Sequence, residues 1–454
     1  MRAEVARYIE AHQEQAVEEL LRLCRQPSVS AQRLGVEECA RLLRDLMEGA
    51  GLEARVLPSP VEGHPVVYAQ RRGRSERTLL FYNHYDVQPP DPLEEWQTPP
   101  FEPTVRDGAV YGRGVSDDKG HLASRLAAVR AFLATEGELP CTVKFIVEGA
   151  EEIGSPGLPE FVAEHRELLR ADACLWEGGG VNWRGQPQVY LGCKGIQYVE
   201  LVCRVANRDS HSSYGTVVPN PAWRLAWALS TLKDRDERVL IPGFYDAVRP
   251  PTEAELAALE ALPHEDEELR RSLGLRGFVL GLRGREWLRR HIFEPTCSIC
   301  GIGGGYQGPG TKTIIPAEAR AKVDFRLVPD QDPEDVVAKL RAHLEAQGFG
   351  DIEVIVEHGE PPARTPIDHP WVRLVRETAR EVYGQEAVVL PSTAGTGPMH
   401  VFAGAPLHLP VASAGVDYPD NRMHAPNENV RLDYFLQGTL HVAAIMARFG
   451  ERGV

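Results

Sequence analysis

Apolar residues along the first 185 positions follow two alternating patterns. Short apolar runs at residues 78–83, 142–147 and 173–176 are typical of buried strands. Between them, residues 37–47 and 119–135 repeat apolar side chains at helical spacing. Because strands that alternate with helices usually form a parallel sheet, the pattern predicts an α/β layer over residues 1–185.

The pattern changes from about residue 186. Residues 199–205 and 319–327 alternate apolar with polar side chains, which is typical of a sheet with one face in water. The other elements expected here are helices at 221–232 and 332–347, a charged helical stretch at 252–292 and a strand at 352–356. Because the α/β pattern returns after Pro361, we predict an α/β domain over 1–185 and 361–454, interrupted by an α+β domain over 186–360.

Composition narrows the class of function. A chain of 454 residues is long enough for two or three domains, and its net charge is -15. Nucleic acids and anionic membranes attract basic surfaces, so neither is predicted as the main partner. No apolar run has membrane-spanning length and no signal-peptide core is visible, and we therefore expect a cytoplasmic protein.

Two local motifs suggest chemistry that their surroundings do not support. Cys297 and Cys300 form a C-x-x-C, but no second pair or nearby histidine completes a zinc site, and core packing is expected instead. Gly303, Gly305 and Gly308 match G-x-G-x-x-G within residues 301–313. No helix start follows to bind a phosphate, so we expect a loop near the substrate.

His84 and Asp86 stand where the apolar run 78–83 ends. Residues two apart in an extended chain point to the same side, so the two side chains are expected to be neighbours. A carboxylate beside an imidazole fixes its tautomer and raises its basicity, which a metal-binding histidine needs. Taken alone, the pair is more simply explained as a surface histidine and aspartate at a strand end.

Four further stretches carry acids or a histidine where we expect an apolar strand to end. They contribute Asp117 and Asp118, Glu151 and Glu152, Glu177, and His424. Each has an ordinary explanation by itself: a helix cap, a solvated pair, a turn and a surface histidine. Together, two histidines and three carboxylates match a ligand set for two zinc or manganese ions, gathered where the strands of an α/β sheet end. A further carboxylate is then available to take a proton from the attacking water.

The motifs "HYDVQP", "YGRGVSDDKG", "EGAEEIGS" and "MHAPNEN" occur in this order and resemble the signatures of a co-catalytic metallopeptidase family. That family holds cytosolic dipeptidases and carnosinases, glutamate carboxypeptidase, aminoacylase, acetylornithine deacetylase and succinyl-diaminopimelate desuccinylase. The resemblance covers nearly the whole chain, and residues 92–114 are most similar to the dipeptidase branch. It implies a mostly parallel, phosphorylase/hydrolase-like catalytic domain of the zinc-peptidase type, with an inserted α+β lid and dimerisation domain that has an antiparallel sheet.

The resemblance also implies roles for the candidate residues. His84, Asp117 and Glu177 would hold one divalent ion, and Asp117, Glu152 and His424 the other, with Asp117 as the bridge. Asp86 would orient His84, and Glu151 would be the general base. Zinc is the expected metal, with manganese and cobalt as alternatives. The peptide bond between Asp117 and Asp118 is expected to be cis.

In the inserted domain, "RDSHSSYG" resembles a lid motif in which His211 would stabilise the oxyanion in the active site of a second subunit, which implies a homodimer. Arg326 would bind the terminal carboxylate of the substrate, as its planar fork suits. Viewed alone, these are a loop histidine and an exposed strand arginine. One stretch departs from the family: Ser392 and Thr393 stand where related dipeptidases carry an Arg-Glu pair, although Gly395 and Thr396 could still contact a substrate.

We therefore predict a metal-dependent hydrolase that cleaves the amide bond of dipeptides or short peptides with a free C-terminal carboxylate. An N-acyl-amino-acid deacylase with the same mechanism is the alternative, because its substrates present the same carboxylate. A binding protein that has lost catalysis is disfavoured because the expected ligands and base are all present.

Overall fold

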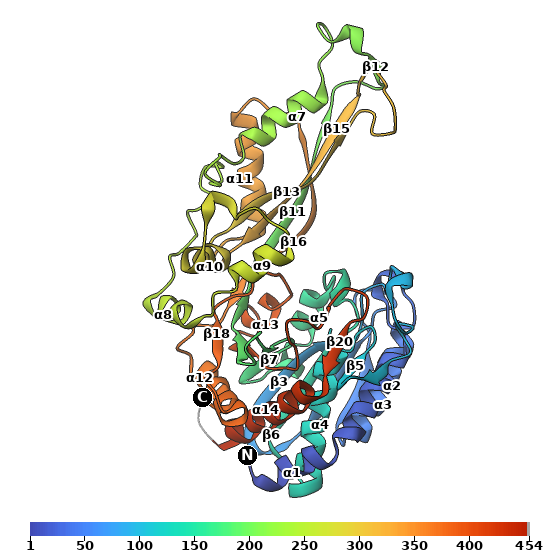
Figure 1. Ribbon diagram of the computed structural model, residues 1–454, viewed down its shortest axis with the longest axis vertical. Helices are drawn as coiled ribbons and strands as arrows, with labels where there is room; N and C mark the ends of the chain where they lie inside the picture. The colour runs from blue at the N-terminus through green and yellow to red at the C-terminus, as the bar shows by residue number, and fades with distance from the viewer. Residues whose placement is uncertain (452–454) are drawn as a thin grey trace. The chain divides into compact units, whose positions relative to one another are not determined.

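The computed structural model describes residues 1–451 and divides into two compact units (Figure 1). Unit 1 contains Met1–Gly192, Arg364–Pro391 and the chain from Pro398 onward, and unit 2 contains Cys193–Ala363 and Ser392–Gly397. The chain crosses between the units at β10 (Gly192–Cys193), at β17 (Ala363–Arg364) and at both ends of Ser392–Gly397. The sequence pattern assigned Ser392–Gly397 to the first domain, but this segment packs with unit 2.

The main sheet of unit 1 has six strands in the order β1-β2-β6-β3-β7-β19. Neighbours among β6, β3, β7 and β19 are parallel, whereas β2 pairs antiparallel with both β6 and β1. The sheet is therefore mostly parallel, as predicted. Its strands are β1 (Glu53–Leu57), β2 (Val66–Arg71), β3 (Gly73–His84), β6 (Leu139–Glu148), β7 (Ala173–Trp176) and β19 (Val411–Ser413).

Two small sheets complete the strands of unit 1. They are β20-β5-β4, made of β20 (Asn429–Arg431), β5 (Ala109–Tyr111) and β4 (Thr104–Arg106), and β18-β9-β8, made of β18 (Val388–Leu390), β9 (Pro187–Tyr190) and β8 (Gly180–Val181). The pairing of β20 with β5 joins segments that are far apart along the chain.

The helices of unit 1 cover its sheets. They are α1 (Ala3–Ala11), α2 (Gln13–Arg25), α3 (Val36–Gly49), α4 (Lys119–Glu136), α5 (Leu158–Glu164), α6 (Arg166–Leu169), α12 (Pro370–Tyr383), α13 (His400–Ala403) and α14 (Leu432–Glu451). Helix α3 buries a single apolar stripe that includes Leu43 and Met47, as its sequence pattern predicts. Helix α4 is different: it packs against α1, α2, α14 and β6, so even its polar residues Lys119, His121 and Arg125 are buried.

Unit 2 is an antiparallel sheet with helices packed against it. The strand order is β13-β15-β11-β16, formed by β13 (Thr296–Gly304), β15 (Glu318–Leu327), β11 (Gly195–Arg204) and β16 (Glu353–Glu360). Helices α7 (Pro221–Ser230) and α11 (Pro333–Ala346) pack against β11. The alternation along β15 places Ala321, Val323 and Phe325 in the core, as the period-two pattern predicts. A separate pair is formed by β12 (Ser210–His211) and β14 (Ile314–Ile315).

Two expectations for unit 2 need correction. The charged stretch 252–292 is divided into α8 (Glu253–Ala261), α9 (Asp266–Ser272) and α10 (Gly284–Phe293). Gly274 and Gly281, both with positive φ, stand in the connection between the last two helices, where an α-helix cannot continue. The glycine cluster 301–313 is not wholly a loop, because Gly301–Gly304 form the end of β13 and pair with β15. Among residues 1–451, no helix is long and apolar enough to cross a membrane.

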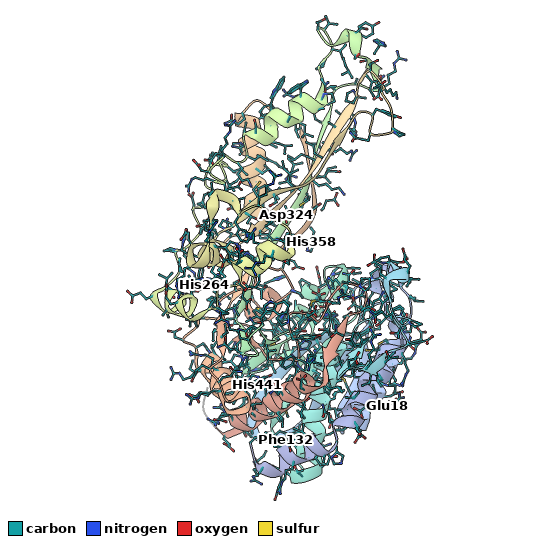
Figure 2. All side chains as sticks on the ribbon, in the orientation of Figure 1. Glu18, Phe132, His264, Asp324, His358 and His441 are labelled. Atoms are coloured by element: carbon teal, nitrogen blue, oxygen red, sulfur yellow. The ribbon has the colours of Figure 1, made fainter. Side chains whose placement is uncertain are left out.

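His441, a buried histidine labelled in Figure 2, makes the stability of unit 1 depend on pH. It is buried on α14, where its Nε2 lies 3.1 Å from the Val375 carbonyl oxygen of α12, and burial lowers its pKa to about 4. Below pH ~6.5 the histidine is protonated in the unfolded chain but stays neutral in the folded chain. The free energy of unfolding therefore falls as the pH drops from about 6.5 toward 4.

We expect the free energy of unfolding to fall by roughly 2 kcal/mol more in the wild type than in His441→Gln between pH 7 and pH 5. Urea unfolding followed by circular dichroism at both pH values measures this difference. An equal loss in both proteins would contradict it.

Candidate metal centre

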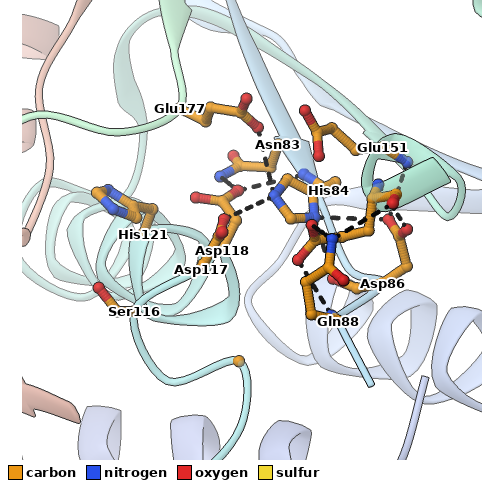
Figure 3. Close-up of polar contacts among 12 residues, drawn as sticks. Asn83, His84, Asp86, Gln88, Ser116, Asp117, Asp118, His121, Glu151 and Glu177 are labelled. Carbon is orange, nitrogen blue, oxygen red and sulfur yellow. Dashed lines mark hydrogen bonds and ion pairs between the residues drawn. The ribbon is translucent and has the colours of Figure 1, made fainter. Parts of the chain in front are cut away.

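Three neighbouring strands of unit 1 deliver candidate ligands to one edge of the sheet (Figure 3). His84 is the last residue of β3, and Glu177 directly follows β7. Glu151 and Glu152 begin the 3₁₀ helix η3 (Glu151–Ile153), shortly after β6 ends. Because β6, β3 and β7 are parallel neighbours, their carboxyl ends meet at the same edge.

The other two candidates reach this edge from loops rather than from strand ends, which corrects the sequence-based expectation. Asp117 lies in the turn that precedes α4, and His424 lies in the loop between β19 and β20. Asp117 and His424 are 307 positions apart along the chain. The pairing of β20 with β5 brings their two segments together.

Asp117 lies between the two histidines. Its Oδ1 is 3.0 Å from His84 Nε2, and its Oδ2 is 2.8 Å from His424 Nε2. Glu177 Oε2 approaches His84 Nε2 to 3.7 Å, and Glu152 Oε2 approaches His424 Nε2 to 3.2 Å. Each oxygen of Asp117 thus faces a separate histidine–glutamate pair, which is how a carboxylate would be arranged between two ions.

The site contains two groups of three residues, and within each group the potential ligand atoms lie within 4.8 Å of one another. One consists of Asp117, Glu152 and His424, and the other of His84, Glu177 and Asp118. Asp118 was absent from the expected ligand set, although it is the second aspartate of the quoted "YGRGVSDDKG". The bond that joins Asp117 to Asp118 is cis, as expected.

Burial of several carboxyl groups in one place shifts their pKa values. Desolvation, together with the negative charges of Asp117 and other nearby carboxylates, raises the pKa of Glu151 and of Glu177 well above the usual range, against the opposing effect of His84. Desolvation also acts to raise the pKa of Asp117, but hydrogen bonds from His424 and His84 outweigh it and lower that pKa. The carboxyl groups of the cluster outnumber its histidines, and burial makes their charged forms costly.

Two divalent ions fit this donor set. Glu177 Oε2 and Asp118 Oδ1 are buried, and neither has a hydrogen-bond partner among the described residues. An anionic oxygen without a partner is costly to bury, and a bound cation removes that cost. Carboxylate oxygens mixed with imidazole nitrogens also suit zinc, manganese and cobalt.

Comparison with known proteins agrees with this geometry. Residues 80–448 match peptidase family M20/M25/M40. The chain belongs to this family. The human Beta-Ala-His dipeptidase is 31% identical to it over 96% of this chain and 86% of that protein. The Cys-Gly metallodipeptidase DUG1 of Saccharomyces cerevisiae is 28% identical over 89% and 86%. The crystal structure of an M20 family metallo-carboxypeptidase, Sso-CP2 from Sulfolobus solfataricus, is similar with 40% identity and a TM-score of 0.90, covering 96% of this chain and 99% of that one.

These comparisons confirm the family, the fold class and the chemistry expected from the motifs. The protein is a metallopeptidase of the M20/M25/M40 family, and its relatives support the dipeptidase branch. They support hydrolysis of dipeptides and give less support to N-acyl-amino-acid deacylation.

In this M20 peptidase, Asp86 supports two elements of the site. The Nδ1 atom of His84 lies 3.0 Å from the backbone carbonyl oxygen of Asp86 and 3.5 Å from its carboxylate. The carboxylate itself accepts hydrogen bonds from the backbone N–H groups of Glu151 and Glu152, at 3.2 and 3.0 Å. Asp86 thus orients His84 mainly through its backbone, and its side chain fixes the turn that carries both glutamates.

Two residues that sequence reasoning did not single out hold other ligands in place. Gln88 donates from Nε2 to Glu152 Oε2 at 2.7 Å, and its backbone N–H donates to Oε1 at 3.1 Å. The fully buried Glu428 carboxylate accepts from the backbone N–H groups of Ser116 and Asp117, at 2.9 and 3.0 Å, and from Arg113 at 2.7 Å. Both residues lie inside quoted motifs, "HYDVQP" and "MHAPNEN", which was the available signal.

The remaining candidates lie in unit 2. Arg326 on β15 donates from Nη1 to Thr396 Oγ1 at 2.6 Å, and its Nε lies 3.3 Å from Asp324 Oδ2. The Gly395 carbonyl accepts from the backbone N–H of Lys194 at 2.9 Å. His211 is exposed on β12, and its Nδ1 accepts from the Ser213 backbone N–H at 3.1 Å. We infer from this bond that the Nε2 of neutral His211 carries the proton and is free to donate.

The position of Asp117 between the histidines predicts different metal losses in two variants. Asp117→Ala should weaken the binding of both ions, whereas His424→Ala should weaken one, because each oxygen of Asp117 faces a different group. After removal of bound metal with a chelator, titration with zinc and elemental analysis of the dialysed protein count the ions that remain. His12→Ala, at an exposed histidine beside α1, is the control. Loss of both ions in His424→Ala would contradict the shared position of Asp117.

Proposed function

We propose that this M20 peptidase hydrolyses dipeptides and short peptides that end in a free carboxylate, using two divalent ions and Glu151 as the proton carrier. The observation that carries the proposal is Asp117, whose two oxygens lie at 3.0 and 2.8 Å from His84 and His424. Glu151, beside these groups, has no assigned ligand role and is available for proton transfer. Cleavage needs both an activated water and an acid for the departing amine.

The ligands proposed for one ion are His84, Asp117 and Glu177, and for the other Asp117, Glu152 and His424. The ions, when bound, would polarise the carbonyl of the substrate and make water a stronger nucleophile at neutral pH. Zinc is our first choice, with manganese and cobalt as alternatives.

Glu151 would take the proton from the attacking water and pass it to the leaving amine. The turn that carries Glu151 is held by the Asp86 carboxylate, so the position of the base is fixed by hydrogen bonds to its backbone. Glu152, the adjacent residue, is held separately by Gln88. Two neighbouring glutamates are thereby given different tasks, one for proton transfer and one for metal binding.

Arg326 is proposed to bind the terminal carboxylate of the substrate. Its guanidinium can form two parallel hydrogen bonds with a carboxylate. Thr396 already accepts one of its N–H groups, and Gly395 lies beside Thr396 on the same segment. The relatives include dipeptidases and a metallo-carboxypeptidase, and substrates of both kinds present a free carboxyl end. Ser392 and Thr393, on that segment, replace the charged pair of related dipeptidases and would alter which side chains are accepted.

We further propose a homodimer in which His211 acts on the active site of the partner subunit. Its exposed position and its free Nε2–H suit a donor to an oxyanion. Unit 2 also exposes large apolar side chains, including Trp223 and Trp227 on α7 and Ile302 on β13. Such surfaces are typical of subunit interfaces. A cytoplasmic location is proposed because all eight cysteines are free thiols.

Glu151→Gln tests the proton carrier. We expect kcat to fall by about 10²–10⁴-fold, because the amide cannot accept the proton, while two ions remain bound. Release of free amino acids from a dipeptide panel with N-acetyl and N-succinyl amino acids added measures both the rate and the substrate class. Glu160→Gln, at an exposed glutamate of α5, should behave as the wild type. Cleavage restricted to the acylated amino acids would favour the deacylase, and an active Glu151→Gln would reject the assigned role.

Arg326→Lys tests carboxylate recognition. Lysine keeps the charge but loses the planar fork, so KM for dipeptides should rise about 10–100-fold. A dipeptide amide has no terminal carboxylate and should be cleaved equally poorly by both proteins. Arg320→Lys, on the same strand and paired with Glu318 and Glu200, is the matched control. An unchanged KM for dipeptides would assign the carboxylate to another residue.

A further inference from the structure

Helix α4 carries a fully buried arginine beneath the metal centre. Arg125 has no exposed surface, and among the described residues it forms no ion pair. Its Nη1 donates to the Tyr82 carbonyl at 2.6 Å and to Asn83 Oδ1 at 2.5 Å, and its Nη2 donates to the Trp176 carbonyl at 2.5 Å. Burying a guanidinium without a carboxylate partner costs free energy. An apolar side chain would fill the same space at a lower cost, so the arginine is expected to have another role.

The acceptors of Arg125 stand next to two proposed ligands. Tyr82 is two residues before His84 on β3, and Trp176 immediately precedes Glu177 at the end of β7. One planar guanidinium therefore bridges the carboxyl ends of two adjacent parallel strands. The separation of these backbones sets the separation of His84 and Glu177, whose side chains are 3.7 Å apart.

Asn83 extends this connection to a third residue of the same group. Arginine only donates hydrogen bonds, so the oxygen of the Asn83 amide must face Arg125 and its nitrogen must face away. The Asn83 nitrogen donates to Asp118 Oδ2 at 2.5 Å (Figure 3). Asp118 Oδ2 also accepts a hydrogen bond from the His84 backbone N–H at 3.2 Å. His84, Glu177 and Asp118, which form one of the two groups of potential ligands, are thus all linked to Arg125.

We propose that Arg125, acting with Asn83, is a positioning residue for the ion held by His84 and Glu177. Its fork fixes the two strand ends, and its positive charge offsets part of the negative charge of the cluster. The inference rests on the proposed function, because it concerns the ligands assigned there. Arg130, on the same helix, provides the contrast: it is partly exposed and pairs with Glu19, as a structural arginine does.

Zinc binding to the full-length protein tests this role. Metal-free wild type, Arg125→Met, Arg125→Lys, Asn83→Ala and the control Arg130→Met are titrated with zinc against a fluorescent chelator. We expect Arg125→Met to weaken one of the two zinc sites about 10–100-fold and to leave the other within about threefold. Arg125→Lys should recover part of the loss, because it restores the charge without the fork. For a dipeptide, kcat should fall while KM stays within about twofold, since the carboxylate is assigned to Arg326.

The outcomes separate this inference from the proposed function. Wild type that fails to bind two zinc ions would overturn the proposed function and the inference with it. Wild type that binds two, beside a folded Arg125→Met that binds both equally well, would overturn the inference alone. If thermal melting shows that Arg125→Met does not fold, Asn83→Ala decides: a smaller loss at the same site supports the role, and wild-type affinity overturns it.

Discussion

Repulsion among buried carboxylates is the constraint on which the rest of unit 1 depends. Six acidic side chains meet at one edge of the main sheet: Asp86, Asp117, Asp118, Glu151, Glu152 and Glu177. Burial removes water from these carboxyl groups and their charges also repel one another, and both effects raise the pKa values of Glu151 and Glu177, with desolvation as the larger one. Divalent ions relieve the repulsion, and the remaining structure has to keep the acids in place for them.

The acids are held largely through the backbone. The carboxylates of Asp86 and Glu428 accept from peptide N–H groups and thereby position the turns that carry Glu151, Glu152 and Asp117. Arg125 is instead a hydrogen-bond donor, and it donates to backbone carbonyls near the ends of β3 and β7. Because these bonds fix the chain rather than the ligand atoms, the ligand oxygens remain available for metal.

The two units divide the work of the enzyme. Unit 1 contains the residues proposed as metal ligands and base, and unit 2 contains Arg326 and Thr396, for which a role in substrate recognition is proposed. Ser392–Gly397 is the clearest example, since it packs with unit 2 although the chain on both sides of it belongs to unit 1. We therefore expect that substitutions in this segment could change substrate preference while the metal centre stays the same.

The sequence by itself determined the central strands, the main amphipathic helices and the residue types of the site, because these depend on spacing within a few positions. The period-two pattern of β15, the helical stripe of α3 and the acids after β6 and β7 were all visible there. Motif resemblance assigned Asp117 as the bridge and anticipated the cis bond that follows it. Only the tertiary structure decided that Asp118 joins the cluster, that Gln88 and Glu428 hold its ligands, and that Arg125 lies beneath it. Those roles arise from contacts between distant segments, up to 311 positions apart for Glu428 and Asp117, and local spacing carries no information about such pairs.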